Sequence, residues 1–166
     1  AASRAYPKLA TYADAADQTG FLYLDLDEAT EHVVACTRAG IQAGFHCIGD
    51  EAVRVGVTAI ERAADRCGVA EVVAARHRLE HVEMITADLV TVMAKLGVVA
   101  SVQPRFDEYW GGDTGMYAAR LGTDRDAVDH AALPGRHPSR RRVYHERSLR
   151  RRDAPAGHLC LQAALP

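Results

Sequence analysis

The sequence has no long apolar run and no paired-cysteine pattern, and these absences argue against several classes of protein. No apolar run reaches about 18 residues, the length that spans a bilayer, so we expect no membrane helix. The first residues lack the basic and apolar regions of a signal peptide. The four cysteines show no CxxC spacing, which predicts reduced thiols and a cytoplasmic protein.

The sequence also lacks the common nucleotide-binding and esterase motifs. It contains no G-x-G-x-x-G, no P-loop and no G-x-S-x-G, so dinucleotide, nucleotide and serine-esterase functions lose their usual support. The remaining composition is that of a globular domain, with 48% hydrophobic and 25% charged residues. A chain of 166 residues is long enough to bury one core of its own.

Charge is distributed unevenly along the chain. Residues 1–126 carry 12 basic and 19 acidic side chains, whereas residues 127–166 carry eight arginines and three acids. No helix or strand periodicity continues beyond Asp126, and prolines interrupt the arginine-rich segment. We therefore expect an ordered domain over 1–126 and an irregular arginine-rich tail over 127–166.

The basic tail leaves a second kind of function open. Clustered arginines can contact phosphates, so a non-enzymatic binding protein whose tail meets nucleic acid or an acidic partner is an alternative. Tyr144 is the single aromatic residue of the tail, and no helical pattern accompanies it. These features make nucleic acid an unfavoured partner.

Helix and strand patterns alternate in the ordered part of the chain. Apolar residues recur at intervals of three and four in segments that begin at a capping residue and end at a glycine, 25–40, 50–68 and 86–97. Short apolar runs after them are predicted strands, 41–46, 76–81 and 98–103. Asp25 and Glu28 form a capping box, and Asp50 and Thr86 are expected N-caps. This alternation predicts an α/β fold with parallel strands.

The remaining segments are less regular. Residues 69–75 are expected to form a linker between the second helix and the second strand. Pro104 stops the third strand, and beyond residue 105 only 116–121 shows a helical pattern.

Two histidines, His46 and His81, close the first two predicted strands. Parallel α/β proteins place their chemistry at the carboxyl ends of strands, and neutral imidazole is a common ligand of zinc and similar metals. The two side chains are therefore candidate ligands of one divalent ion, although spacing alone leaves open that they are unrelated. Gln103 and Ser101, near the end of the third strand, could contact a substrate or simply be hydrated.

Other polar residues near these strands have more than one interpretation. The segment from His77 to His81 matches H-x-x-E-H, a zinc-protease motif that needs a helix, but the strand pattern fits this segment better. His77 and Glu80 are candidate partners that would orient a metal-bound imidazole. Glu80 could instead pair with Arg78, and Asp50 fits a helix cap better than a catalytic base.

Four blocks of the sequence, in the same order, resemble one enzyme superfamily. They are residues 20–25, 40–53, 77–81 and 97–104. They resemble the metal-dependent amidohydrolases and are most similar to the branch that contains the N-substituted formamide deformylases. The resemblance covers about residues 1–125.

This resemblance implies a fold, a cofactor and a reaction. The fold would be part of a TIM (β/α)8 barrel, about strands 5–7 with their helices. His46 would be a metal ligand at the end of the fifth strand and His81 at the end of the sixth, while Gln103, at the end of the seventh, would bind substrate. The metal, expected to be zinc, would activate water to hydrolyse an amide- or formamide-type C–N bond, other than a peptide bond, in a small molecule.

Parts of the family pattern are missing from this sequence. They are the His-x-His pair of the first strand, the bridging ligand of the fourth and the aspartate of the eighth. We therefore expect a truncated fragment in which the tail, 127–166, is read in a shifted frame. No catalytic residue is assigned. We expect the chain to be inactive alone and to form a homo-oligomer or to pair with a complementing chain.

Overall fold

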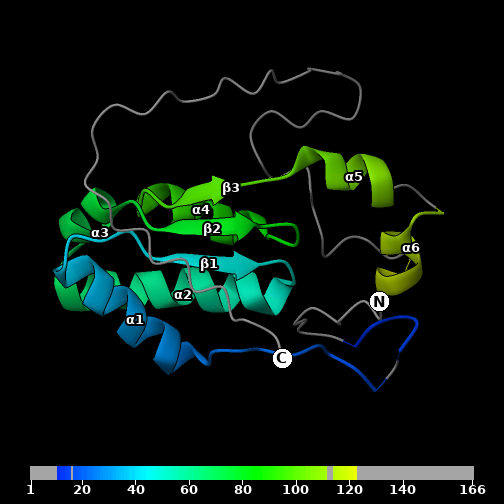
Figure 1. Cartoon of the computed structure of the whole chain (residues 1–166), viewed down its shortest axis with the longest axis horizontal. Coiled ribbons are helices and arrows are strands. Elements are labelled where there is room, and N and C mark those ends of the chain that lie inside the picture. Colours follow the sequence, from blue (N-terminus) through cyan, green and yellow to red (C-terminus); the bar gives the residue numbers. More distant parts are fainter. Residues whose placement is uncertain (1–10, 16, 112–113, 123–166) are drawn as a thin grey trace.

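A parallel three-stranded sheet with helices packed along it forms the described part of the chain (Figure 1). The computed structural model describes residues 11–15, 17–111 and 114–122. The arginine-rich tail predicted over 127–166 lies outside these residues. The strands follow the order β1-β2-β3, and each neighbouring pair is parallel. The predicted α/β fold with parallel strands is confirmed.

The elements alternate as the sequence predicts. In chain order they are α1 (Leu26–Arg38), β1 (Gly44–Cys47), α2 (Asp50–Cys67), α3 (Val69–Ala75), β2 (Arg78–His81), α4 (Ala87–Lys95), β3 (Val99–Ser101), α5 (Pro104–Trp110) and α6 (Met116–Leu121). The capping box at α1 is confirmed, because Asp25 Oδ1 accepts the Glu28 N–H at 2.8 Å and Glu28 Oε2 accepts the Asp25 N–H at 3.0 Å. Within the described residues, no helix has the length and apolar character that crossing a bilayer requires.

The three strands are shorter than the predicted 41–46, 76–81 and 98–103, and three other segments differ from the prediction. The N-cap of α2 is Gly49, and Asp50 is the first helical residue, with its carboxylate accepting the Glu51 N–H at 2.8 Å. The expected linker, 69–75, forms α3 because burial of Val72 in the core stabilises a helical turn there. The sequence shows no helical pattern directly after the third strand, but Pro104–Trp110 forms α5. Proline fits the first turn of a helix, because the N–H groups of that turn make no hydrogen bond within the helix.

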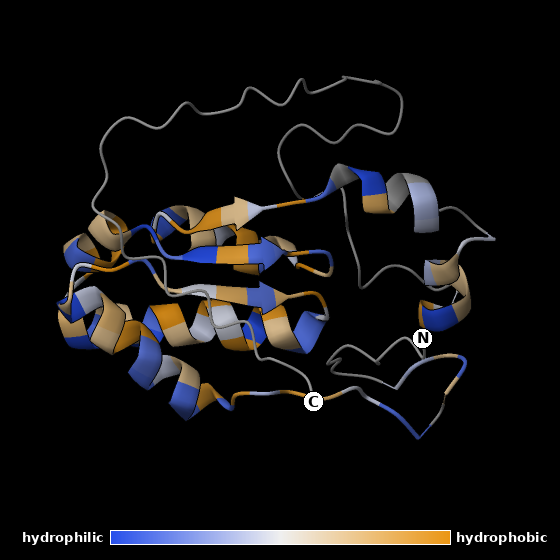
Figure 2. Ribbon diagram, in the orientation of Figure 1, coloured by the Kyte–Doolittle hydropathy of each residue, from blue (hydrophilic) through white to orange (hydrophobic). Residues whose placement is uncertain are grey.

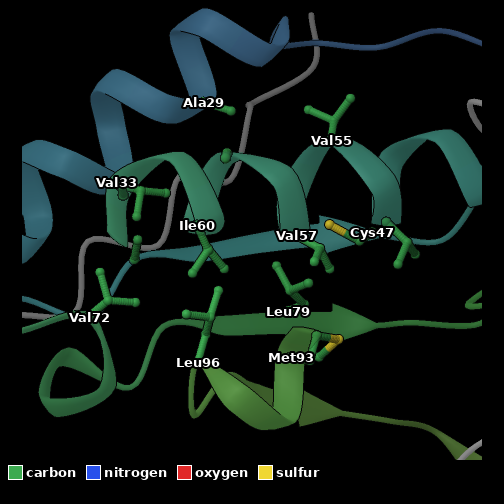
Figure 3. Close-up of a cluster of buried hydrophobic side chains, with 14 of the residues drawn as sticks. Ala29, Val33, Cys47, Val55, Val57, Ile60, Val72, Leu79, Met93 and Leu96 are labelled. Atoms are coloured by element: carbon green, nitrogen blue, oxygen red, sulfur yellow. The ribbon is translucent and has the colours of Figure 1, made fainter. Parts of the chain in front are cut away.

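The core lies between the sheet and the helices that cover one of its faces (Figure 3). Leu79 of the central strand is fully buried and clusters with Ile60 of α2 and with Leu96, the C-cap residue of α4. Burying a side chain of this size contributes about 1.5–3 kcal/mol. Helix α2 approaches the sheet closely at Gly56, where an added Cβ would lie 3.1 Å from Cys47 Sγ and 3.2 Å from Leu79 Cδ2.

The two faces of the sheet differ in polarity. Leu79 and Cys47 lie on the buried face. Arg78 and Glu80, which alternate with Leu79, lie on the opposite face together with His46. Figure 2 accordingly shows the central strand as mainly hydrophilic. A central parallel strand is usually apolar on both sides. The polar residues of β2 therefore indicate that this face of the sheet has a role other than packing against a hydrophobic core.

Helices α5 and α6 lie beyond the carboxyl ends of the strands. Figure 1 shows both at the end toward which the three strand arrows point. Their side chains are therefore placed to contribute to a site at this end of the sheet.

At the opposite end, a buried histidine joins α1 to the sheet. His77 Nδ1 accepts the Ala43 N–H at 3.0 Å, so its Nε2–H donates to Thr37 Oγ1 at 2.9 Å. The Thr37 hydroxyl in turn donates to the Val33 carbonyl at 2.8 Å. Burial, helped by the nearby charge of His32, lowers the pKa of His77 to about 4. The neutral imidazole therefore has partners at both nitrogens.

We expect the chain to lose stability as the pH falls from about 6.5 to about 4. Within this window the unfolded chain protonates His77 and the folded chain does not, so the free energy of unfolding decreases by about 2–3 kcal/mol. Urea unfolding at a series of pH values measures the change. The variant His77→Gln does not titrate at this position and should lose that part of the pH dependence, whereas a pH profile identical to that of the parent chain would contradict the assignment.

Candidate functional site

The imidazoles of His46 and His81 meet at the carboxyl ends of β1 and β2. His46 Nδ1 lies 2.9 Å from His81 Nε2. Their ring centroids are 5.0 Å apart, with the planes tilted by 37°. His46 is exposed and His81 is half-buried. The structure thus brings together the two residues that the sequence singles out, while their role as metal ligands stays a prediction.

His81 reaches His46 because the backbone reverses at this residue. The register pairs His46 with Glu80 and Cys47 with His81, so strict alternation would direct His81 to the buried side of the sheet. Instead His81 has a φ of 73° and Val82 a φ of 53°. The Val82 N–H donates to the carbonyl of Glu80 at 3.0 Å, which closes a three-residue turn centred on His81, and to that of Cys47 at 2.9 Å. Such left-handed conformations cost non-glycine residues about 1–3 kcal/mol each and cluster at functional sites.

The other side of the His81 ring is covered by protein. Phe106 of α5 stacks on it, with ring centroids 6.0 Å apart and planes within 12°. His81 Nδ1 is buried and has no hydrogen-bond partner within the part of the chain that the structure describes. Glu83 Oε1 lies 3.8 Å from this nitrogen, beyond hydrogen-bond range. His81 is therefore fixed on one side and presents Nε2 to His46 on the other.

Glu80 is ion-paired with Arg78, which confirms one of the two interpretations of this residue. Arg78 also donates to Ser101 Oγ at 2.9 Å. Partial burial acts to raise the pKa of the Glu80 carboxyl, but hydrogen bonds from Arg78 and Ser101 and the charges of Arg78 and His46 outweigh it, so the pKa lies below its ordinary value. Glu80 therefore carries a negative charge directly across from His46, its partner in the strand register.

Gln103 follows the end of β3 rather than lying within the strand. Its Nε2 donates to the Ser101 carbonyl at 3.2 Å, while its Oε1 is buried and accepts no hydrogen bond from any described residue. A buried amide oxygen without a partner costs free energy, and a ligand that donates a hydrogen bond would recover it. The predicted role in substrate binding is compatible with this arrangement and stays a prediction.

Two interpretations of the sequence are wrong, and both concern His77. This side chain faces α1 at the start of β2, where it bonds to Thr37 and Ala43. It therefore cannot orient a metal-bound imidazole at the carboxyl end of the strand. The H-x-x-E-H motif does not form a zinc-protease site, because Arg78–His81 is a strand and the motif needs a helix.

Two neighbours of His81 were not predicted from the sequence. Glu83 lies two residues beyond it and belongs to no motif. Phe106 comes from a segment in which no helical pattern was recognised. The one local signal for Phe106 is the preceding Pro104, which is typical of the first turn of a helix.

The donor atoms present fit part of a metal site. Two ligands on a tetrahedral zinc ion at ordinary Zn–N distances lie roughly 3.3 Å apart, close to the 2.9 Å between His46 Nδ1 and His81 Nε2. Among the described residues, no cluster of three or more His, Cys, Asp and Glu side chains could hold a metal. The two imidazoles therefore fit two positions of a coordination sphere that other residues would complete.

Comparison with known proteins places the chain in an enzyme family. A model of the amidohydrolase family matches residues 2–134. The crystal structure of an uncharacterized metal-dependent hydrolase from Pyrococcus furiosus is 27% identical, with a TM-score of 0.58 over 74% of this chain. A second uncharacterized metal-dependent hydrolase, from Pyrococcus horikoshii OT3, is 23% identical to this chain and resembles this chain in fold, with a TM-score of 0.59 over 76% of its residues. Protein LONG AFTER FAR-RED 3 of Arabidopsis thaliana is 27% identical over 114 residues, or 69% of this chain.

The chain spans only a small part of each of these proteins. It covers 23% of each solved hydrolase and 18% of the plant protein. Metal dependence is a property of the larger hydrolases. The three parallel strands described above are consistent with a section of such a larger fold, such as the predicted partial barrel.

Proposed function

The chain belongs to the amidohydrolase family, and we propose on this premise that it is part of a metal-dependent hydrolase acting on a C–N bond other than a peptide bond. The observation that carries the proposal is the convergence of His46 Nδ1 and His81 Nε2, 2.9 Å apart, at the carboxyl ends of adjacent parallel strands. Parallel α/β enzymes place their chemistry at this end.

The residues of this chain have distinct parts in the proposal. His46 and His81 hold a divalent metal, expected to be zinc, through Nδ1 and Nε2 respectively. When bound, such a metal lowers the pKa of a coordinated water to about 7 and polarises a carbonyl. Gln103 binds the substrate, because its buried Oε1 has no hydrogen-bond partner among the described residues and is able to accept the N–H of an amide. An amide or N-substituted formamide of small size fits this chemistry and the sequence resemblance.

Other residues must complete such a site. Catalytic zinc usually has three protein ligands, and the described residues supply two. In the described part of the chain β1 and β3 are the edges of the sheet, and each is able to pair with a further strand. We propose that a second copy or a separately encoded chain supplies the missing ligands. Free thiols at Cys36, Cys47 and Cys67 support a reducing location, the cytoplasm, as part of the same proposal.

The first prediction concerns the metal. Titrating the full chain with Zn²⁺ or Co²⁺ in a calorimeter should detect weak binding, because two imidazoles are an incomplete ligand set. His46→Ala and His81→Ala should each weaken the affinity by about tenfold or more, since each removes one ligand. His32→Gln, on α1 and outside the site, is the matched control and should bind as the parent chain does. Equal affinities in all four proteins would contradict the ligand assignment.

The second prediction concerns turnover. The purified, metal-loaded chain should hydrolyse N-acyl and N-substituted formamide substrates no faster than the metal-containing buffer does, because two ligands and no proton shuttle do not make an ordinary catalytic site. Product amine is measured by chromatography. Turnover that is present in the chain and lost in His46→Ala would show that the chain is active without a partner.

The third prediction concerns residues 127–166, which we propose to be read in a shifted frame. The other two frames of the 3′ end of the gene are translated and searched for a strand with a Gly-Ser-Asp-like end, as the family resemblance implies. We expect one frame to contain it. Its absence from both frames would show that the arginine-rich tail is a genuine part of the protein.

A further inference from the structure

The His81 ring is one member of a closed circuit of side-chain contacts that the proposed hydrolase function does not use. Phe106 stacks on His81 and is 4.6 Å from Trp110, centroid to centroid. Trp110 is 6.3 Å from Tyr117 of α6, in an edge-on arrangement. The Tyr117 hydroxyl donates to Glu83 Oε2, and Glu83 Oε1 lies 3.8 Å from His81 Nδ1. The circuit therefore ties His81 to both helices beyond the ends of the strands.

Burial makes the contact between Glu83 and His81 significant. The side chain of Glu83 is 11% exposed and that of His81 is 16% exposed, so the charge of the carboxylate is weakly screened. One carboxylate oxygen accepts the hydrogen bond from Tyr117, and the other faces a buried ring nitrogen that has no hydrogen-bond partner in the described residues. A buried N–H without an acceptor is costly. A shift from 3.8 Å to roughly 2.9 Å would form a hydrogen bond here.

We propose that Glu83 is a positioning residue for His81 and that Tyr117 holds Glu83 in place. A neutral imidazole carries one N–H, and the nitrogen that carries it is set by the available acceptor. With Glu83 beside Nδ1, the proton resides on Nδ1, and the lone pair of Nε2 points toward His46. This is the form of His81 that is able to bind a metal through Nε2, so the inference rests on the proposed function for its purpose.

The arrangement has a second consequence, because Tyr117 belongs to α6. Glu83 follows the strained turn at His81 and Val82, and its hydrogen bond to Tyr117 attaches this turn to a helix that is distant in sequence. The orientation of His81 therefore depends on the docking of α6 and not only on the strand that carries it.

The test reads the tautomer of His81 directly. Long-range ¹H–¹⁵N correlation spectra of the metal-free, full-length chain are recorded at about pH 8, well above the ordinary pKa of histidine. We expect the Nδ1–H form to predominate in the parent chain. Glu83→Ala should move the population toward the Nε2–H form, and Tyr117→Phe should move it in the same direction by less. Glu83→Gln keeps an acceptor oxygen of the same shape and should retain most of the Nδ1–H form.

Two matched variants control for general effects on the fold. Glu61→Ala replaces an exposed glutamate of α2, and Tyr109→Phe removes the hydroxyl of an exposed tyrosine of α5. Neither should change the tautomer of His81. If Glu83→Ala fails to fold, the near-isosteric Tyr117→Phe carries the test.

A second measurement separates this inference from the proposed function. Co²⁺ affinity should fall about 10- to 100-fold in Glu83→Ala, as is usual when the partner of a metal-bound histidine is removed. A tautomer shift in the variants of a chain that binds no Co²⁺ would support the role of Glu83 while contradicting the metal site. An unchanged tautomer in Glu83→Ala and Tyr117→Phe would overturn the role of Glu83, whatever the metal affinity.

Discussion

The approach of His81 Nε2 to His46 Nδ1 is the contact on which the candidate site depends, and it exists because the backbone leaves the strand conformation at His81. In cross-strand register His46 lies opposite Glu80, and His81 lies opposite the buried Cys47. A regular strand would place the two imidazoles on opposite faces. The positive φ of His81 brings its ring to the polar face. This conformation costs free energy, which burial of Val82 in the core and the two hydrogen bonds of its N–H help to offset.

Environment, rather than residue type, separates the roles of the histidines on these strands. His77 directly precedes β2, and His81 is the last residue of this strand. At one end, His77 is enclosed by α1 and β1, both of its nitrogens have partners, and burial keeps it neutral. At the other end, the nitrogens of His81 face a second imidazole and a carboxylate. At His77, both ring nitrogens are hydrogen-bonded and the side chain joins α1 to the sheet. At His81, ring nitrogen atoms stay available to a ligand.

Much of the fold was predictable because local interactions determine it. The capping box of Asp25 and Glu28, the apolar spacing of α2 and the alternation of helices with short strands are all visible in the sequence, and the structure has them. The helix α3 was not predictable in this way, because the burial of Val72 that stabilises it comes from distant parts of the chain. For the same reason, a strand-end histidine such as His81 is recognisable from sequence, but its stacking partner Phe106 is not. Glu83 is close in sequence, but it belongs to no motif that would mark it as a partner of His81.

By itself, the sequence determined that the chain forms a parallel α/β unit, and it placed His46 and His81 at the ends of neighbouring strands. Periodicity, capping residues and strand order suffice for this, because they act over a few residues. Only the tertiary structure decided that the two rings face each other, that Glu83 lies beside one of them and is bonded to Tyr117, and that His77 is buried. These relations arise from one reversed backbone turn and from the packing of helices against the ends of the sheet, and neither has a repeating pattern in the sequence.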